Sequence, residues 1–190
     1  GRCKSFDADA NGYVRSEGAG VILLKPLAAA LRDRNQIHAV IRGTAVNSDG
    51  RSQGLAAPSQ RSQAACVRDA FRRAGIEPKE AQYVEAHGTG TRQGDPIELR
   101  ALGSVLGSER LKEQPCRIGS VKTNLGHGET AAGITGLIKA VLCVRERKLP
   151  PSLHFKKPNS SVDFEDLGLR VQTELEEFPN LRAPLVVGVS

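Results

Sequence analysis

Helix-like and strand-like patterns alternate along this sequence, and the alternation is the strongest constraint on its fold. Three segments, 62–74, 95–106 and 129–149, carry apolar residues at the spacing of a helix face. Shorter apolar runs predict strands at 19–27, 37–46, 82–87, 117–122, 169–173 and 185–189. Because helices between strands usually connect neighbours of a parallel sheet, the pattern predicts an α/β fold whose parallel or mixed sheet is covered by helices.

The second and third helices show further local signals. Asp95 as a cap, Pro96 at the first helical position and Glu98 three residues after the cap form a capping-box pattern. The third helix has its large apolar residues on one face, namely Ile134, Leu137, Ile138, Val141 and Leu142. Its first turns are thin and permit a close backbone approach, because they consist mainly of Ala131, Ala132, Gly133 and Gly136.

Length and composition describe an ordinary globular chain. The 190 residues suffice for one domain, with 39% hydrophobic and 25% charged residues. No apolar run approaches the roughly 20 residues that span a bilayer, and no leader opens the sequence, so we expect no membrane association and a cytoplasmic location. The sequence has no Met, starts at Gly1 and stops inside an apparent strand. These features predict a piece of a longer polypeptide.

Cysteine spacing and charge argue against two further classes. The four cysteines are widely spaced without a C-x-x-C pair, so zinc and disulfide frameworks are weakly supported. The net charge is +6, but the basic residues are scattered and only 4% of residues are aromatic. Nucleic-acid binding is therefore not expected. An acidic protein partner or a phosphate-bearing substrate would suit the charge equally well.

Two histidines occupy matching places in the pattern. His87 follows the strand at 82–87, and His127 follows the segment "IGSVKTNLG"; each precedes a helix. Ligands of open α/β sheets bind outside the carboxyl ends of strands, so both imidazoles should meet there. A histidine at a strand end is more often structural, as we expect for His38 and His154. The interpretation that the pair is functional depends on the glycines that clear space beside both rings: Gly88, Gly90, Gly126 and Gly128.

Several chemistries could use such a pair. A zinc site needs a third ligand, and we do not expect Glu85 to supply it. A serine nucleophile would sit on a G-x-S-x-G turn, which is absent, and "GTGTRQG" lacks the lysine of a phosphate-binding P-loop. What remains is a pair of neutral imidazoles that donate N–H bonds to a carbonyl oxygen on which charge develops.

The motifs around both histidines resemble those of one family. "VEAHGTGTRQGDPIE" and "IGSVKTNLGHGETAAGITGLIKA" are similar to the two histidine motifs of β-ketoacyl synthases, in the form found in modular type I polyketide synthases. "GRCKSFDADANGYVRSEGAGVILLKPL" and "NSDGRSQGLAAPSQ" also resemble that family, so the resemblance covers essentially the whole chain. It implies a thiolase-like fold, layered αβαβα in the full domain. Residues 1–190 would be the later part of a ketosynthase domain, the C-terminal half with a preceding segment.

The resemblance also implies residue roles. His87 and His127 would hold the thioester carbonyl of a malonyl-type extender during decarboxylation, and Lys122 would support them electrostatically. Thr89 and Thr91 would bond the phosphopantetheine arm. We expect both rings to be neutral, with pKa values at or below the usual one, because Lys122 and the following helix start supply positive potential.

The family also implies partners and a reaction. The reaction is a decarboxylative Claisen condensation in polyketide or fatty-acid elongation, with substrates carried on the phosphopantetheine of acyl carrier protein. No cofactor or metal is expected to bind directly. The expected partners are acyl carrier protein, the rest of the ketosynthase domain, neighbouring synthase domains and a second copy in a homodimer.

Some positions depart from the family pattern. Ser16 replaces a more usual glycine, and Gly128 replaces a common leucine. The family's nucleophilic cysteine lies in a T-A-C-S-S stretch that does not occur here, and none of the four cysteines matches it. We therefore expect this chain alone to be inactive. The alternative is a condensation-inactive decarboxylase or a carrier-protein binding module, in which the cysteine outside this chain is replaced.

Overall fold

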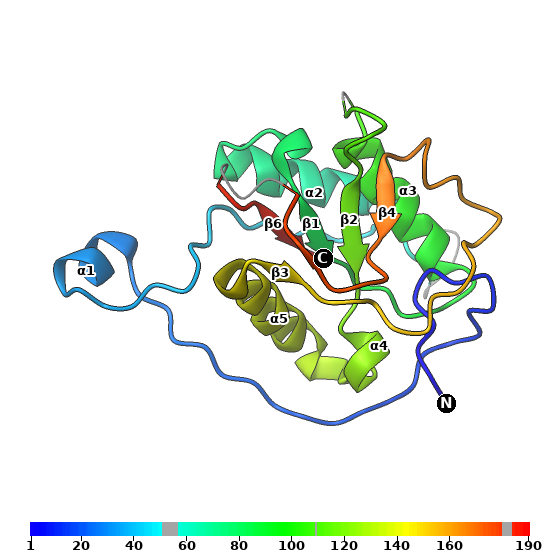
Figure 1. Cartoon of the computed structure of the whole chain (residues 1–190), viewed down its shortest axis with the longest axis horizontal. Helices are drawn as coiled ribbons and strands as arrows, with labels where there is room; N and C mark the ends of the chain where they lie inside the picture. The colour runs from blue at the N-terminus through cyan, green and yellow to red at the C-terminus, as the bar shows by residue number, and fades with distance from the viewer. Residues whose placement is uncertain (51–56, 109, 180–183) are drawn as a thin grey trace.

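A computed structural model describes residues 1–50, 57–108, 110–179 and 184–190 of this protein. At its centre lies a four-stranded sheet with the strand order β4-β2-β1-β6, in which all neighbouring strands are parallel (Figure 1). The strands are β1 (Tyr83–Glu85), β2 (Cys116–Gly119), β4 (Leu169–Val171) and β6 (Val187–Val189). The four strands predicted beyond residue 80 are thereby confirmed. A separate antiparallel pair consists of β3 (Lys148–Leu149) and β5 (Glu176–Glu177).

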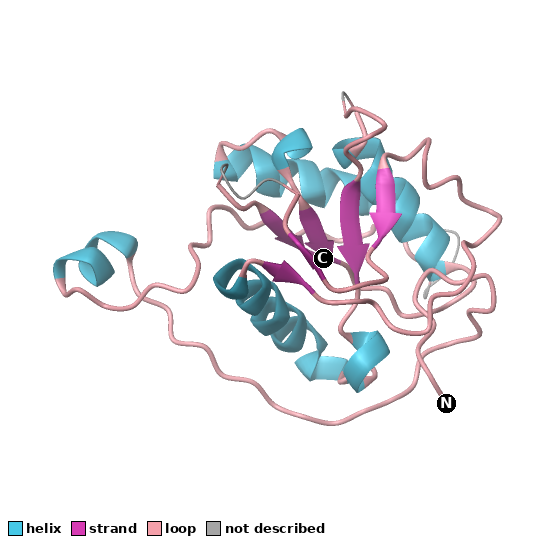
Figure 2. Cartoon of the chain, viewed as in Figure 1, coloured by secondary structure: helices cyan, strands magenta, loops and turns pink. Residues whose placement is uncertain are grey.

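Helices cover both faces of the sheet (Figure 2). On one face α2 (Gln60–Ala74) packs against α3 (Gly94–Leu106), and on the other α5 (Ala132–Glu146) contacts β1 and β6. The three predicted helices are confirmed. The shorter helical segments are α1 (Leu27–Arg32), η1 (Pro78–Glu80), α4 (Lys122–Leu125) and η2 (Glu129–Ala131). In the part of the chain that the structure describes, no helix is long and apolar enough to cross a membrane.

The central strand β1 is buried on both faces. Val84 belongs to the larger core cluster, in which Leu99, Leu102 and Leu106 of α3 pack on the sheet. Tyr83 points to the opposite face and packs in a second cluster with Cys143 of α5. Strand neighbours alternate between faces, so two helical layers clamp β1 from both sides. The end of β1, from which His87 emerges, is therefore rigidly placed.

Helix α5 buries a different face from the one its sequence emphasises. Its buried residues are small, namely Ala132, Gly136, Ala140 and Cys143. The predicted apolar stripe lies beside this face: Leu142 is 42% exposed, and Ile134, Leu137, Ile138 and Val141 are half-buried. The physical reason is close approach, since a Cβ at Gly136 would lie only 3.3 Å from Cγ of Glu85. The prediction of a thin helix that approaches closely is confirmed.

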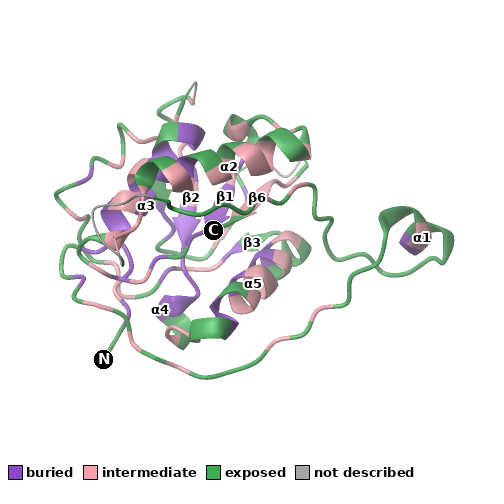
Figure 3. Cartoon of the chain, turned by 180° about the vertical axis from the view of Figure 1, so that it is seen from behind, coloured by how far each residue is buried: buried purple, intermediate pink, exposed green. Residues whose placement is uncertain are grey.

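Two predicted strands are wrong. The segments 19–27 and 37–46 are not strands, and together with α1 they form an extended arm, residues 19–46, whose α1 end projects from the body (Figures 1 and 3). Near its other end, Arg42 and Thr44 bond to α2. A strand requires a neighbour that accepts its backbone hydrogen bonds, and no pairing involves these segments among the described residues. The arm instead exposes its large apolar side chains: Val21, Leu23, Leu24, Leu27, Leu31, Ile37, Val40, Ile41 and Val46.

The contrast between α3 and α5 gives a stability test. Leu106 of α3 is 0% exposed, whereas Leu142 of α5 is 42% exposed. Leu106→Ala should lower the free energy of unfolding by about 2–5 kcal/mol through lost burial and a residual cavity. Leu142→Ala, the matched control, should lower it by less than about 1 kcal/mol. Urea denaturation of the two variants measures both values, and equal losses would contradict the orientation of α5.

Candidate active site

The two histidines meet at the carboxyl edge of the sheet, as predicted. The ring centroids of His87 and His127 are 5.4 Å apart, with the planes at 86°. The His127 ring also lies 4.9 Å from that of Tyr13. His87 follows β1, and His127 lies just beyond α4, which follows β2. Adjacent parallel strands thus deliver the two imidazoles to one place.

A pocket of about 620 Å³ opens beside His87. Thr89 and Thr91 line it together with Glu98 and with Ser190, the residue after β6. Further lining residues are Asp49, Ala57, Pro58, Gln63, Gln93 and Gly94. The structure therefore brings His87 and both predicted threonines to one cavity. His127 does not line the cavity but lies next to it, with its ring against that of His87.

Two carboxylates of α3 hold the loop that carries His87. Glu98 accepts the backbone N–H groups of His87 at 2.7 Å and Gly88 at 2.8 Å. Asp95 accepts those of Gly90 at 3.0 Å and Thr91 at 3.3 Å. The predicted capping box is thus wrong: α3 already begins at Gly94, and neither carboxylate caps it. Burial nevertheless raises the pKa of Asp95 and of Glu98, and the N–H bonds oppose that rise.

The N-cap position of α3 is Gln93, which makes no side-chain cap bond, and the first amide of the helix is bonded by a threonine instead. Thr91 Oγ1 accepts the backbone N–H of Gly94 at 3.1 Å and lies 3.1 Å from Thr89 Oγ1. A hydroxyl can donate and accept at once, so both threonines retain hydrogen-bonding capacity toward the pocket. Thr91 therefore has a structural role besides the one that its motif implies.

The glycines of the histidine loops make room mainly for the protein itself. Gly88 has φ +47°, and a Cβ there would come within 2.7 Å of Ser120 Cβ. Gly90 has φ +73°, and its Cβ would meet the backbone of Lys4 at 3.1 Å. Both positions require glycine for their left-handed conformation and for close packing. At these two positions the prediction that the glycines clear space beside the histidine rings is wrong, because the space they leave is filled by the protein itself.

Charge and burial keep both imidazoles neutral. Burial, followed by the positive charge of Lys122 and the neighbouring His127, lowers the pKa of His87 to about 4. His87 is nevertheless solvent-exposed where it lines the pocket, so the desolvation acts on a ring that is only partly enclosed. Burial and Lys122 also lower the pKa of His127. The predicted direction is confirmed, and desolvation, which the sequence did not reveal, is the larger cause.

A backbone contact sets the tautomer of His127. Its Nδ1 accepts the N–H of Glu129 at 2.9 Å, so the proton of the neutral ring resides on Nε2. Glu129 adopts the left-handed region, with φ +50°, in making this turn. The ring consequently presents an N–H donor at its far end.

Lys122 is buried where α4 starts. It is 4% exposed, and burial lowers its pKa while the charges of Glu98 and Glu85 act in the opposite direction. Lys122 in turn affects the pKa of both histidines. The structure thus couples Lys122 to both histidines, while Thr89 and Thr91 line the pocket beside His87.

Sequence reasoning missed the part played by the N-terminal segment. Ser5 donates its hydroxyl proton to the carbonyl of Gly88, and Gly12 N–H donates to the carbonyl of Gly90 at 2.8 Å. His127 N–H donates to the carbonyl of Val14 at 2.7 Å, and Ser16 N–H donates back to His127 at 2.9 Å. The available signal was the turn-rich string "DADANG", whose backbone must find partners somewhere.

The cysteines are poor candidates for a nucleophile in this chain. All four are free thiols. Burial raises the pKa of Cys116 to about 12 and that of Cys143 to about 11, so neither is a thiolate at neutral pH. Among the described residues, no three His, Cys, Asp or Glu side chains cluster as metal ligands do.

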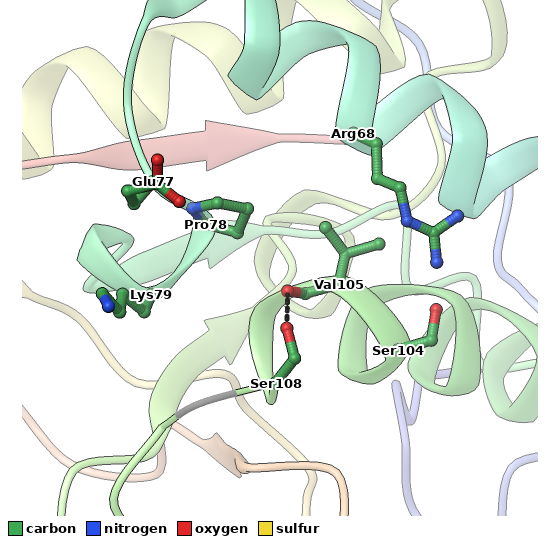
Figure 4. Close-up of a pocket in the computed structure, with 7 residues that line it drawn as sticks. All are labelled: Arg68, Glu77, Pro78, Lys79, Ser104, Val105 and Ser108. Atoms are coloured by element: carbon green, nitrogen blue, oxygen red, sulfur yellow. Dashed lines mark hydrogen bonds between the residues drawn. The ribbon is translucent and has the colours of Figure 1, made fainter.

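A smaller pocket of about 240 Å³ lies between α2, α3 and η1 (Figure 4). Its lining residues are Arg68, Glu77, Pro78, Lys79, Ser104, Val105 and Ser108, none of which belongs to the histidine motifs. The Ser108 hydroxyl donates to the carbonyl of Val105 at 3.0 Å across its wall. We assign no function to it.

Comparison with known proteins identifies the family. Residues 38–156 match the model "Beta-ketoacyl synthase, C-terminal domain", and residues 1–30 match "Beta-ketoacyl synthase, N-terminal domain". The chain belongs to the β-ketoacyl synthase family. It is 54% identical over all of its 190 residues to one subunit of the phenolphthiocerol/phthiocerol polyketide synthase of Mycobacterium tuberculosis, and it covers 10% of that subunit.

Solved structures show the same fold. The ketosynthase from module 6 of the bacillaene synthase of Bacillus subtilis 168 matches with TM-score 0.90 and 46% identity, covering 95% of this chain and 32% of its own. Ketosynthase twelve of the bacillaene polyketide synthase of Bacillus amyloliquefaciens matches with TM-score 0.94 and 38% identity, over 100% of this chain and 34% of its own. The thiolase-like fold is thereby confirmed. The chain spans about a tenth of its curated relatives and a third of these ketosynthases.

The lowered pKa of His87 gives a pH test. Because its pKa is lowered to about 4, His87 should stay neutral from pH 8 down to about pH 5, whereas an ordinary histidine is half protonated near 6.5. NMR titration of the imidazole carbon signals in the folded chain, with His87→Gln to assign the peak, measures this. A midpoint near 6.5 would contradict the desolvated environment of the ring.

Proposed function

We propose that this chain is the later part, residues 1–190, of a ketosynthase domain that catalyses decarboxylative Claisen condensation. The substrates would be an acyl thioester and a malonyl-type extender on acyl carrier protein, in polyketide or fatty-acid chain elongation. The observation that carries the proposal is the pair of neutral imidazoles, 5.4 Å apart at the carboxyl edge of a parallel sheet. Two such donors suit a single carbonyl oxygen.

The proposed chemistry follows from the neutrality of the rings. The extender's thioester carbonyl accepts N–H bonds from His87 and from Nε2 of His127. The bond to the carboxylate then breaks, carbon dioxide leaves, and its electron pair forms an enolate whose negative charge lies on that oxygen. Charge appears only as the reaction proceeds, so the two donors stabilise the transition state more than the bound substrate. The buried cation of Lys122 adds positive potential.

The enolate carbon then forms the new carbon–carbon bond. It attacks the acyl carbon of a thioester on the nucleophilic cysteine, and the thiolate of that cysteine leaves. In this proposal the cysteine belongs to the earlier part of the ketosynthase domain. The raised pKa values of Cys116 and Cys143 support its being elsewhere. We accordingly expect the 190-residue chain alone not to condense acyl thioesters.

The pocket beside His87 suits a narrow polar chain. Its volume is about 620 Å³, and the hydroxyls of Thr89 and Thr91 line it. We propose that it receives the phosphopantetheine arm of the carrier protein, with both hydroxyls as hydrogen-bond partners. No other cofactor is part of the proposal.

The arm at residues 19–46 suits the proposed partners. Contiguous exposed apolar side chains mark surfaces that another protein part covers. Residues 1–30 match the N-terminal domain model, which makes the earlier part of the ketosynthase domain the fitting partner. A homodimer, neighbouring synthase domains and acyl carrier protein complete the proposed assembly. The net charge of +6 suits an acidic carrier, and four free thiols suit the cytoplasm.

Replacing either histidine should separate two steps of the reaction. In the full protein, His87→Ala and His127→Ala should each lower malonyl decarboxylation by about 10²–10³-fold, because one donor to the developing oxyanion is lost. Acyl loading of the cysteine should change far less, since loading needs only a thiolate. Radiolabelled loading and carbon dioxide release measure the two steps separately.

His154 provides the matched control for these variants, because it takes part in none of the site contacts and its left-handed backbone (φ +63°) is one that asparagine tolerates. His154→Asn should leave both steps unchanged. Wild-type rates of decarboxylation in His87→Ala and His127→Ala would contradict the proposed function. An equal loss of acyl loading in correctly folded protein would contradict the proposal that the histidines serve decarboxylation and not loading.

The threonines should separate substrate binding from stability. Thr89→Ala in the full protein should raise the KM for the malonyl carrier about fivefold, since one hydrogen bond contributes about 1 kcal/mol. Thr91→Ala should do the same and also lower the free energy of unfolding by about 1 kcal/mol, because the Thr91 hydroxyl accepts the first amide of α3. Thr91→Ser keeps the hydroxyl and serves as control. Unchanged KM in both alanine variants would exclude the proposed contact.

A further inference from the structure

A buried charged cluster joins β1, the strand that leads to His87, to α5. Glu85 of β1 and Lys139 of α5 form an ion pair of 2.7 Å, with side-chain exposures of 2% and 11%. The Tyr83 hydroxyl donates to the same carboxylate at 2.7 Å, and Lys139 Nζ donates to that hydroxyl at 2.9 Å. None of these three residues has a role in the proposed chemistry.

The second oxygen of Glu85 reaches the other histidine-bearing segment. Oε1 accepts the backbone N–H of Val121 at 2.5 Å. Val121 is the residue before α4, so Lys122 follows it directly, and His127 lies just past the end of that helix. Glu85 itself precedes His87 by two residues on β1. One carboxylate therefore joins the strand that delivers His87 to the start of the helix that delivers Lys122 and His127.

Stability alone does not account for a charge at this position. The free energy of removing an ion pair from water cancels much of the attraction between its charges, and well-packed neutral side chains often stabilise a fold equally well. Here the burial also requires Gly136, whose missing Cβ lets α5 approach Glu85. The carboxylate has two effects on the site: it fixes the backbone of Val121, and its charge opposes the lowering of the Lys122 pKa by burial.

We infer that Glu85 is a positioning residue for the condensation: its carboxylate, held by Lys139 and Tyr83, fixes α4 relative to His87. The inference rests on the proposed function. The Glu85 carboxylate is engaged by Lys139, the Tyr83 hydroxyl and the Val121 N–H, so it acts through the backbone of Val121 and does not touch substrate. A displacement of α4 by about 1 Å would separate the two N–H donors from a common oxygen, and such errors can cost about 10²-fold in rate.

The test compares two double variants in the full protein that differ only in the acceptor offered to Val121. Glu85→Gln with Lys139→Met is neutral and keeps a carbonyl oxygen in reach of that N–H. Glu85→Met with Lys139→Met is neutral, similar in volume and has no acceptor. We expect the Met/Met protein to lose about 10²-fold in kcat for malonyl decarboxylation, and the Gln/Met protein to stay within about tenfold of wild type.

Three readouts distinguish positioning from general destabilisation. In the Met/Met protein the KM for the malonyl carrier and acyl loading should each stay within about twofold of wild type. Leu106→Ala, a core variant outside the site, should lower stability without a selective loss of decarboxylation. Equal kcat in the two double variants, or parallel loss of loading, would overturn the inference.

Whether the Met/Met protein folds also tests the inference. If it fails to fold while the Gln/Met protein folds, the Val121 bond is needed for the fold itself and the assignment is overturned. Failure of the proposed function is distinguishable, because it appears as normal decarboxylation in the histidine variants. Normal decarboxylation in both double variants, with the histidine variants impaired, would overturn only the role of Glu85.

Discussion

Buried carboxylates that accept backbone N–H groups are the interaction on which this site depends. The loops that carry functional side chains have no sheet or helix to satisfy their amides, and an unsatisfied buried amide is costly. Asp95 and Glu98 serve the His87 loop from α3, and Glu85 serves the residue before α4. Asp7 does the same for Lys156 and Lys157. Side chains anchored elsewhere in the fold thereby fix the conformation of loops that have no regular backbone pairing.

The cost of burying these charges is offset locally. Each carboxylate has several donors, and Glu85 has a cation as well. Lys122 is buried, and the charges of Glu98 and Glu85 oppose the lowering of its pKa by burial. Lys122 in turn lowers the pKa of both imidazoles. The acidic residues, the lysine and the histidines thus act on one another's charge, and the neutral donor pair that the proposed chemistry needs is one result.

The sequence predicted the sheet body and the histidine pair because both follow from local patterns. Parallel strands end at one edge, so a histidine after each of two neighbouring strands must arrive there. Prediction from the sequence failed where a segment's structure depends on residues that are distant along the chain. The arm has strand-like residues such as Val21 and Ile41, but pairing needs a neighbour that no local pattern supplies. Asp95 and Glu98 fit a capping pattern equally well, and only the tertiary structure shows that loop amides compete for them.

The N-terminal segment connects the two histidine loops over a very short stretch of chain. Gly12 is bonded to the first loop, and Val14 is bonded to the second. Two residues span at most about 7 Å, so this stretch limits how far apart the two histidine loops can lie. Its length leaves little tolerance: one inserted or deleted residue would change the span by roughly 3.3 Å, as much as a whole hydrogen bond. The distance between the two imidazoles therefore depends partly on the number of residues in a segment that contains neither histidine.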